Sequence, residues 1–82
     1  MNSAQQTKLG LERIVVENKV IITVNVIFPS AELASKLVTL GYKQGAPGME
    51  HHWHVVVRSA QELDAVRGPI ASLFNAKGEL IG

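Results

Sequence analysis

Hydrophobic and polar positions alternate most clearly between Leu11 and Phe28, and this pattern predicts a β-hairpin. Val and Ile dominate the stretch, and both favour strands because their branched side chains pack well on a pleated sheet. Glu17-Asn18-Lys19 interrupts the apolar run, and Asn tolerates the left-handed backbone of a tight turn. A three-residue loop would place Val16 opposite Val20 and align the apolar side chains, so we expect that loop rather than a two-residue one.

The second strand of this hairpin has two unlike faces. One face is wholly apolar and is expected to lie in the core: Val20, Ile22, Val24, Val26 and Phe28. The other face is half apolar and half polar: Ile21, Thr23, Asn25 and Ile27. Because side chains alternate along a strand, the two sets must point to opposite sides of the sheet.

Two segments have the period of a helix. The first follows Ser30, a good N-cap residue, and ends at Gly41, which suits a helix C-terminus. The second follows Ser59, and Glu62 completes a capping box in which each residue binds the other's backbone amide. Its apolar stripe continues to Phe74 across Gly68-Pro69. Proline disrupts a helix, so we expect a kinked helix or two short ones, ending at Gly78.

Strands are predicted between and after these helices. Residues 42–48 are predicted to form a short strand followed by a Gly/Pro turn. Residues 49–58 are predicted to form a longer strand. In the longer strand Trp53, Val55 and Val57 face one way, with His51 in phase with Trp53. The opposite side carries His52, His54, Val56 and Arg58. Residues 79–81 would add a short edge strand.

The resulting order is β(β)αββα(β), which predicts an α+β fold of the ferredoxin-like α/β sandwich type. Its antiparallel sheet would carry two helices on one face and an N-terminal β-hairpin. Those helices would bury Ile22, Val24, Val26, Trp53, Val55 and Val57. Residues 1–10 are expected to form a flexible tail, and residues 11–82 a single domain.

Composition and charge narrow the possible functions. Eight basic and seven acidic residues are well mixed, with a net charge of +1, so the basic stripe of a nucleic-acid binder is missing. No apolar run is long enough for a transmembrane helix, and the polar first ten residues do not resemble a secretory signal. We therefore expect a cytoplasmic protein with no membrane contact. A small core without cysteines favours stabilisation by a metal or a partner subunit.

All three histidines and the single tryptophan lie together in His51-His52-Trp53-His54. Alternation splits this cluster, with Trp53 in the core and the pair His52 and His54 on the open face. Such a pair is a weak candidate for metal binding, because zinc sites use three or four protein ligands. We expect no cofactor. A metal-responsive or pH-responsive binder centred on the histidines is an alternative function.

The open sheet face is the predicted binding surface. Its residues are expected to be Ile21, Thr23, Asn25, Ile27, His52, His54, Val56 and Arg58. Exposed apolar patches often mark partner surfaces, so a homodimer or another protein would cover this face, unless the first strand or the tail folds over it. The chain lacks a nucleophile with an evident base, a phosphate loop and suitably paired carboxylates. We therefore expect a non-enzymatic binding or regulatory module.

From Phe28 onward the chain is similar to small bacterial regulators of the ribonuclease E inhibitor B type. The shared features are Phe28-Pro29, Leu40-Gly41-Tyr42, Trp53 and Gly78-Glu79. The resemblance implies a strand, a helix ending in Gly-Tyr, a strand pair, and a second helix before a final strand. It also implies regulation of another protein by binding, as a further alternative function.

Overall fold

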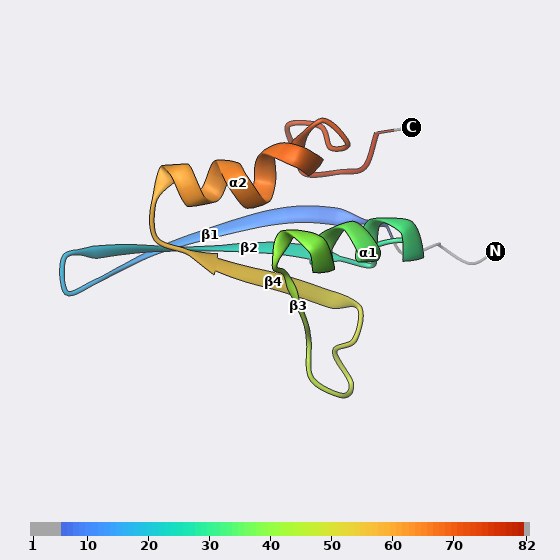
Figure 1. The fold of residues 1–82 in the computed structure, drawn as a ribbon, viewed down its shortest axis with the longest axis horizontal. Coiled ribbons are helices and arrows are strands. Elements are labelled where there is room, and N and C mark those ends of the chain that lie inside the picture. Colours follow the sequence, from blue (N-terminus) through green and yellow to red (C-terminus); the bar gives the residue numbers. More distant parts are fainter. Residues whose placement is uncertain (1–5, 82) are drawn as a thin grey trace.

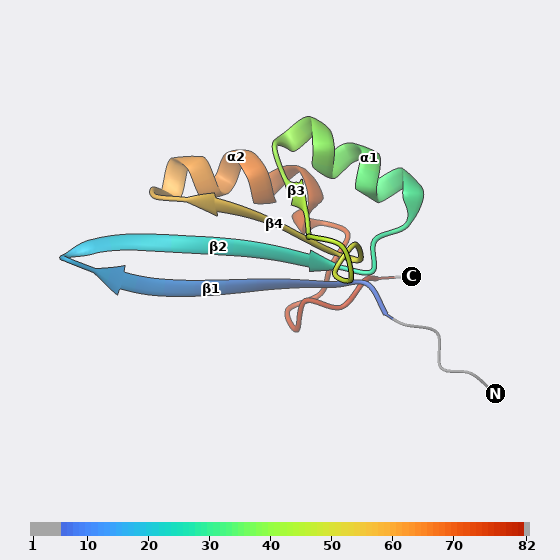
Figure 2. The ribbon, with the colours of Figure 1, turned by 90° about the horizontal axis from the view of Figure 1, so that it is seen from below.

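A computed structural model describes residues 6–81 and shows a small α+β fold, a four-stranded antiparallel sheet with two helices on one face (Figures 1 and 2). The strands are β1 (Lys8–Val16), β2 (Lys19–Ile27), β3 (Lys43–Gln44) and β4 (His52–Val57), and the helices are α1 (Ala31–Leu40) and α2 (Ala60–Ala71). The sheet order is β1-β2-β4-β3. Both β2 and β3 pair antiparallel with β4, so they run parallel to each other with β4 between them.

The hairpin register differs from the prediction. Val16 pairs with Lys19, so the turn contains only Glu17 and Asn18, whose φ angles are 51° and 66°. Two left-handed residues form a type I′ turn, whose twist suits a hairpin. The observed register places Leu9 beside Val26 on the helix-covered face. The expected loop would have turned Glu12 toward the helices instead, and burial of a leucine near the core outweighs apolar alignment at the exposed tip.

The core lies between the sheet and the two helices. Its fully buried side chains come from both layers, Val24 and Val26 from β2, Leu37 from α1 and Ile70 from α2. The six side chains predicted to face the helices do so: Val24, Val26 and Val57 are buried, and Ile22, Trp53 and Val55 are partly buried. Prediction of the core face is therefore confirmed for these six residues. It was wrong for Phe28, which follows the end of β2 with a φ of 51° and stacks on His51 outside the core.

The predicted helix caps are present. The Ser30 hydroxyl accepts a hydrogen bond from the Leu33 amide at 3.1 Å, and Gly41 ends α1 with a φ of 98°. The Ser59 hydroxyl accepts from the Glu62 amide, also at 3.1 Å. The Glu62 carboxylate, however, accepts from the Arg58 amide at 2.8 Å, one residue before the amide that a standard capping box uses. Both helices thus begin where local sequence predicts.

The second helix ends earlier than predicted. It stops at Ala71, with Pro69 in its last turn. Gly68 precedes the proline and has no Cβ to clash with the proline ring, which makes the helical backbone acceptable there. Gly78 does not end the helix but lies in a turn with a φ of 79°. The predicted final strand is reduced to isolated bridges, which pair Lys8 with Glu79 and Phe74 with Leu80.

The other strand boundaries also shift. β3 and β4 are shorter than the predicted segments, and β1 starts at Lys8 rather than Leu11. The Thr7 hydroxyl donates to the Phe28 carbonyl at 2.6 Å, which ties the start of β1 to the end of β2. Residues 1–5 of the predicted tail lie outside the described residues. Neither described helix has the length and apolar character needed to cross a membrane.

Candidate interaction surface

The sheet face opposite the helices gathers seven of the eight residues predicted for the binding surface, all except Arg58. The pairs Thr23 with Val56, Asn25 with His54 and Ile27 with His52 point to this side, as does Ile21. Arg58 follows the end of β4 directly, and its amide is bound by Glu62. We call this side the open face, because both helices pack on the other side of the sheet (Figure 2).

The first strand adds residues to the open face that the sequence analysis did not find. Gly10, Glu12 and Ile14 pair with Asn25, Thr23 and Ile21, so all of them share one side of the sheet. They were missed because the predicted register was displaced by one residue, which reverses every side chain of β1. The alternation Lys8-Leu9-Gly10-Leu11-Glu12 was the available signal, since only its leucines suit the core.

A hydrogen-bonded chain crosses the polar end of the open face. The Asn25 side-chain amide donates to the Glu12 carboxylate at 3.4 Å, and the Asn25 Oδ1 lies 2.9 Å from the His52 Nε2. A carboxylate only accepts, so the Asn25 nitrogen faces Glu12 and the Asn25 oxygen faces His52. The His52 Nε2 must therefore carry the proton and donate to Asn25. This chain orders three side chains from three different strands.

The same end of the face is hollowed. Gly10 has no side chain, and a shallow depression of about 330 Å³ lies around it. The residues lining it are Lys8, Leu9, Gly10, Glu12, Asn25, Ile27, His52 and Lys77. The lining mixes cationic, anionic and apolar groups.

The two histidines of the open face are close, with ring centroids 6.2 Å apart in an edge-on arrangement. In the part of the chain from 6 to 81, no group of three or more His, Cys, Asp or Glu residues is placed to hold a metal ion. One ring nitrogen of His52 is also engaged by Asn25. A metal on this pair would therefore need further ligands from another molecule.

The other end of the open face is apolar. It carries Ile14, Val16 and Val56, which are 51%, 47% and 52% exposed, together with the partly buried Ile21. We call these four residues the apolar end. Ile14 and Val16 belong to the tip of the β1–β2 hairpin, which extends past both helices (Figures 1 and 2). We call residues 11–20 of this hairpin the arm.

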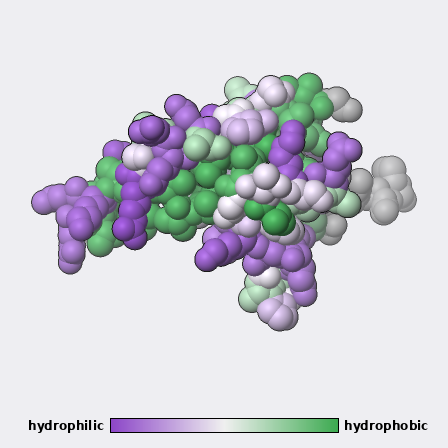
Figure 3. All heavy atoms as spheres, in the orientation of Figure 1, coloured by the Kyte–Doolittle hydropathy of each residue, from purple (hydrophilic) through white to green (hydrophobic). Residues whose placement is uncertain are grey.

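The arm is also apolar on its other side. Leu11 and Val15, on the helix-facing side of β1, are 47% and 59% exposed, because β1 is the edge strand and α2 packs on β2 and β4 instead. Figure 3 shows hydrophobic atoms along the arm behind its hydrophilic tip. Apolar side chains are thus accessible on both sides of one edge strand.

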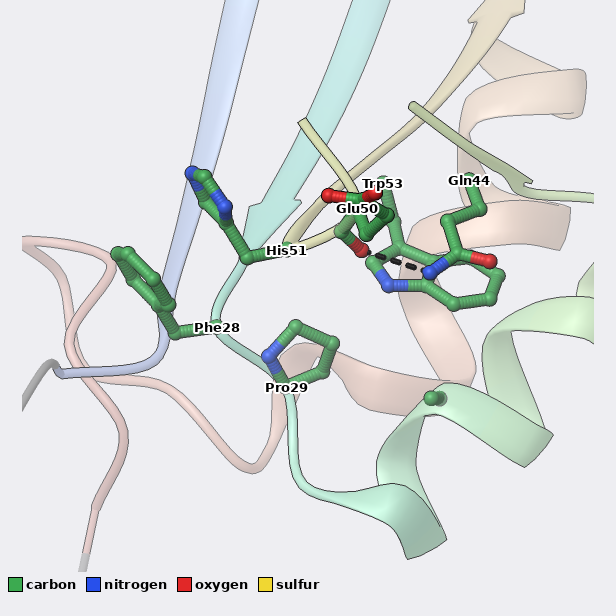
Figure 4. Close-up of a pocket in the computed structure, with 7 residues that line it drawn as sticks. Phe28, Pro29, Gln44, Glu50, His51 and Trp53 are labelled. Carbon is green, nitrogen blue, oxygen red and sulfur yellow. Dashed lines mark hydrogen bonds between the residues drawn. The ribbon is translucent and has the colours of Figure 1, made fainter. Parts of the chain in front are cut away.

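His51 takes no part in the open face. It lies in the turn before β4 and stacks on Phe28, with ring centroids 4.4 Å apart and planes 7° apart. Phe28 has a φ of 51°, a conformation that side chains other than glycine rarely adopt. The stack borders an open pocket of about 430 Å³, lined also by Pro29, Ala34, Gln44, Glu50 and Trp53 (Figure 4).

The polar groups of this pocket are mostly satisfied by the chain itself. The Gln44 side-chain amide donates to the Glu50 carbonyl at 2.8 Å. Hydrogen bonds from the Gly48 and Glu50 backbone lower the pKa of the Glu50 carboxyl below its usual value. The pocket holds one carboxylate and one stacked imidazole, without a nucleophile placed beside a base.

No protein-family model matches this chain, and no curated protein or solved structure is significantly similar to it. The resemblance to regulators of the ribonuclease E inhibitor B type therefore stays a prediction.

Proposed function

We propose that this protein is a small non-enzymatic interaction module that works as a homodimer, with the arm of the β1–β2 hairpin as its contact surface. The observation that carries the proposal is the gathering of four exposed apolar side chains on the arm, Leu11, Ile14, Val15 and Val16. Each such side chain, when buried, would contribute about 25 cal/mol per Å² of apolar area removed from water.

The size of the core supports a second copy as the partner. Only eight hydrophobic side chains are buried among residues 6–81, and small domains commonly gain stability by oligomerisation. The net charge of +1 gives little long-range attraction to a strongly charged partner. Along the arm, acidic Glu12 and Glu17 alternate with basic Arg13 and Lys19, a mixture that can complement itself.

The experiment is a measurement of molar mass in solution. Light scattering or sedimentation at about 10–100 μM, the range in which modest dimers form, should give twice the mass of the chain. The double variant Ile14→Lys/Val16→Lys should be monomeric, because it places two charges on the contact surface. Val38→Lys is the matched control, since Val38 is 60% exposed on α1 and should leave the dimer intact. A monomeric wild-type protein over this range would overturn the proposal.

We also propose that the fold is a variant of the ferredoxin-like sandwich. The support is the unit β2–α1–β3, whose two parallel strands flank β4, a split βαβ arrangement. In this interpretation β1 occupies the edge beside β2, and the segment after α2 contributes only the bridge between Lys8 and Glu79.

A further inference from the structure

The outer edge of β1 is occupied at one end only. The Leu9 amide donates to the Gly78 carbonyl at 2.7 Å, and Lys8 bridges Glu79. Within residues 6–81, no backbone hydrogen bond joins this outer edge to another segment between Leu11 and Val16. Backbone groups of an edge strand alternate between inward and outward directions, so those of Leu11, Arg13 and Val15 point outward like those of Leu9.

We propose that the β1 edges of two copies pair antiparallel, with Ile14 facing Ile14 of the second copy. This inference rests on the proposed homodimer and specifies how its two chains meet. The sheets join edge to edge into one continuous sheet, and the two open faces become a single surface. The contact extends the main-chain ladder, the general mode by which an exposed strand recruits another.

The occupied end of the edge limits the possible registers. In a symmetric antiparallel pair of β1 strands, one residue lies at the two-fold axis and faces the same residue of the second copy. We call this residue the centre of the register. Centring on Glu12 would place Val15 of the second copy against Leu9, whose amide is already bound by Gly78. Centring on Arg13 would bring the turn of the second copy to the same blocked position. Only centres farther along the arm leave Leu9 and Gly78 undisturbed.

Charge and hydrogen bonding select among the same registers. Centring on Glu12 or Arg13 also sets that charge directly against its own copy, which is destabilising. Centring on Val15 retains a single hydrogen-bonded residue pair. Centring on Ile14 pairs each Arg13 with a Val15 and forms about four inter-strand hydrogen bonds, without opposed like charges.

The side chains nearest an Ile14 centre are apolar. The two Ile14 side chains meet at a position without hydrogen bonds, where Cα atoms approach to about 4.5 Å. Arg13 lies diagonal to both Glu17 and Arg13 of the second copy, so an attractive and a repulsive diagonal neighbour offset each other. Lys19 shares a row with Glu12 of the second copy, separated only by Val16.

Disulfide cross-linking tests this register directly, because the chain has no native cysteine. Ile14→Cys should form a dimeric disulfide on mild oxidation, since a Cα separation of about 4.5 Å falls within disulfide geometry. Ile21→Cys is the matched control. Ile21 lies beside Ile14 on the same face, but two copies of it would be three strand spacings apart, about 14 Å, and should not cross-link.

Two further variants separate edge pairing from stacking of the open faces. Arg13→Pro removes an outward amide, which an edge strand tolerates, and should yield a monomer, whereas Arg13→Ala keeps the amide and the dimer. Val56→Lys should leave the dimer intact, because β4 is not at the paired edge. If Arg13→Pro does not fold, the cross-linking pair still decides.

The outcomes distinguish the two proposals. A dimer in which Ile14→Cys fails to cross-link, or in which Ile21→Cys cross-links equally, overturns edge pairing and leaves the homodimer standing. Dissociation by Val56→Lys would likewise favour face-to-face stacking. A monomeric wild-type chain overturns both. Cross-linking of Ile14→Cys only, with a monomeric Arg13→Pro variant, supports the edge-paired dimer.

Discussion

Two residues outside the strands, Gly78 and Tyr42, each bind a distant segment through a backbone group of the chain. The Gly78 carbonyl accepts the Leu9 amide, and the Tyr42 hydroxyl donates to the Val66 carbonyl of α2 at 2.8 Å. Gly78 can do this because it has no Cβ, while Tyr42 is 4% exposed and protonated. The first contact depends on backbone shape and the second on a proton, so they respond to different perturbations.

Replacement of Gly78 by alanine should be costly. Gly78 has a φ of 79°, and a Cβ there would collide with the Leu9 carbonyl oxygen. The left-handed backbone by itself costs roughly 1–2 kcal/mol for an L-residue, and we expect Gly78→Ala to lose more than that in urea unfolding. Gly10→Ala is the matched control, because a Cβ at Gly10 meets nothing within 4 Å, and it should gain about 0.5–1 kcal/mol. Equal effects of the two changes would contradict this account.

Alkaline pH should weaken the fold through Tyr42. Burial raises its pKa from 10.0 to about 12, against a small opposing effect of Arg67. Since the folded state retains the proton, the contribution is fully present below about pH 10 and declines as pH rises toward 12. We expect the stability difference between wild type and Tyr42→Phe to shrink by about 1.4 kcal/mol at about pH 11, relative to neutral pH. Urea unfolding of both proteins at both pH values measures it, and a constant difference would refute it.

At the scale of elements, neighbouring residues determine where each helix starts, whereas a contact between distant residues determines the register of the hairpin. The start of each helix depends on a serine hydroxyl and the amide three residues later, and the sequence predicted both. The hairpin register depends on whether Leu9 or Glu12 faces the helices, which involves Val26, far along the chain. The predicted register aligns Ile14 and Val16 with the apolar face of β2 instead, but both residues lie near the exposed tip, where burial does not discriminate between registers.

The two-residue turn can be tested by substitution at Glu17. Its φ of 51° is unfavourable for most side chains but acceptable for asparagine. Glu17→Asn should therefore stabilise the hairpin by about 0.5–1 kcal/mol, and the β-branched Glu17→Val should destabilise it by a similar or larger amount. Amide exchange of Ile14 and Ile21 reports the local stability of the arm. A three-residue loop would give no such ordering of the two variants.

At the scale of the whole molecule, the dominant feature is the imbalance between body and arm. The body buries its apolar side chains under two helices, whereas the arm leaves Leu11, Ile14, Val15 and Val16 about half exposed. The molecule is elongated as a result, with extents of 47 × 29 × 23 Å. A second copy that covers the arm would add its burial to that of a small core.

Dimerisation makes thermal stability depend on concentration. Because association stabilises only the folded state, the melting temperature of the wild-type protein should rise by roughly 5 °C between about 1 and 100 μM, given the enthalpy of a domain this small. The Arg13→Pro variant should melt at one temperature across the same range. Calorimetry or circular dichroism provides the measurement, and a concentration-independent wild type would argue against a dimer.

The sequence by itself determined the features that depend on neighbouring residues. These are the two helix starts, the stop of α1 at Gly41, and the apolar and polar faces of β2 and β4, because caps and alternation act within a few positions. Tertiary structure decided the side of β1 that faces the helices, the end of α2 at Ala71, and the meeting of Glu12, Asn25 and His52. Those features depend on which distant segments compete for the same buried space, and no local pattern contains that information.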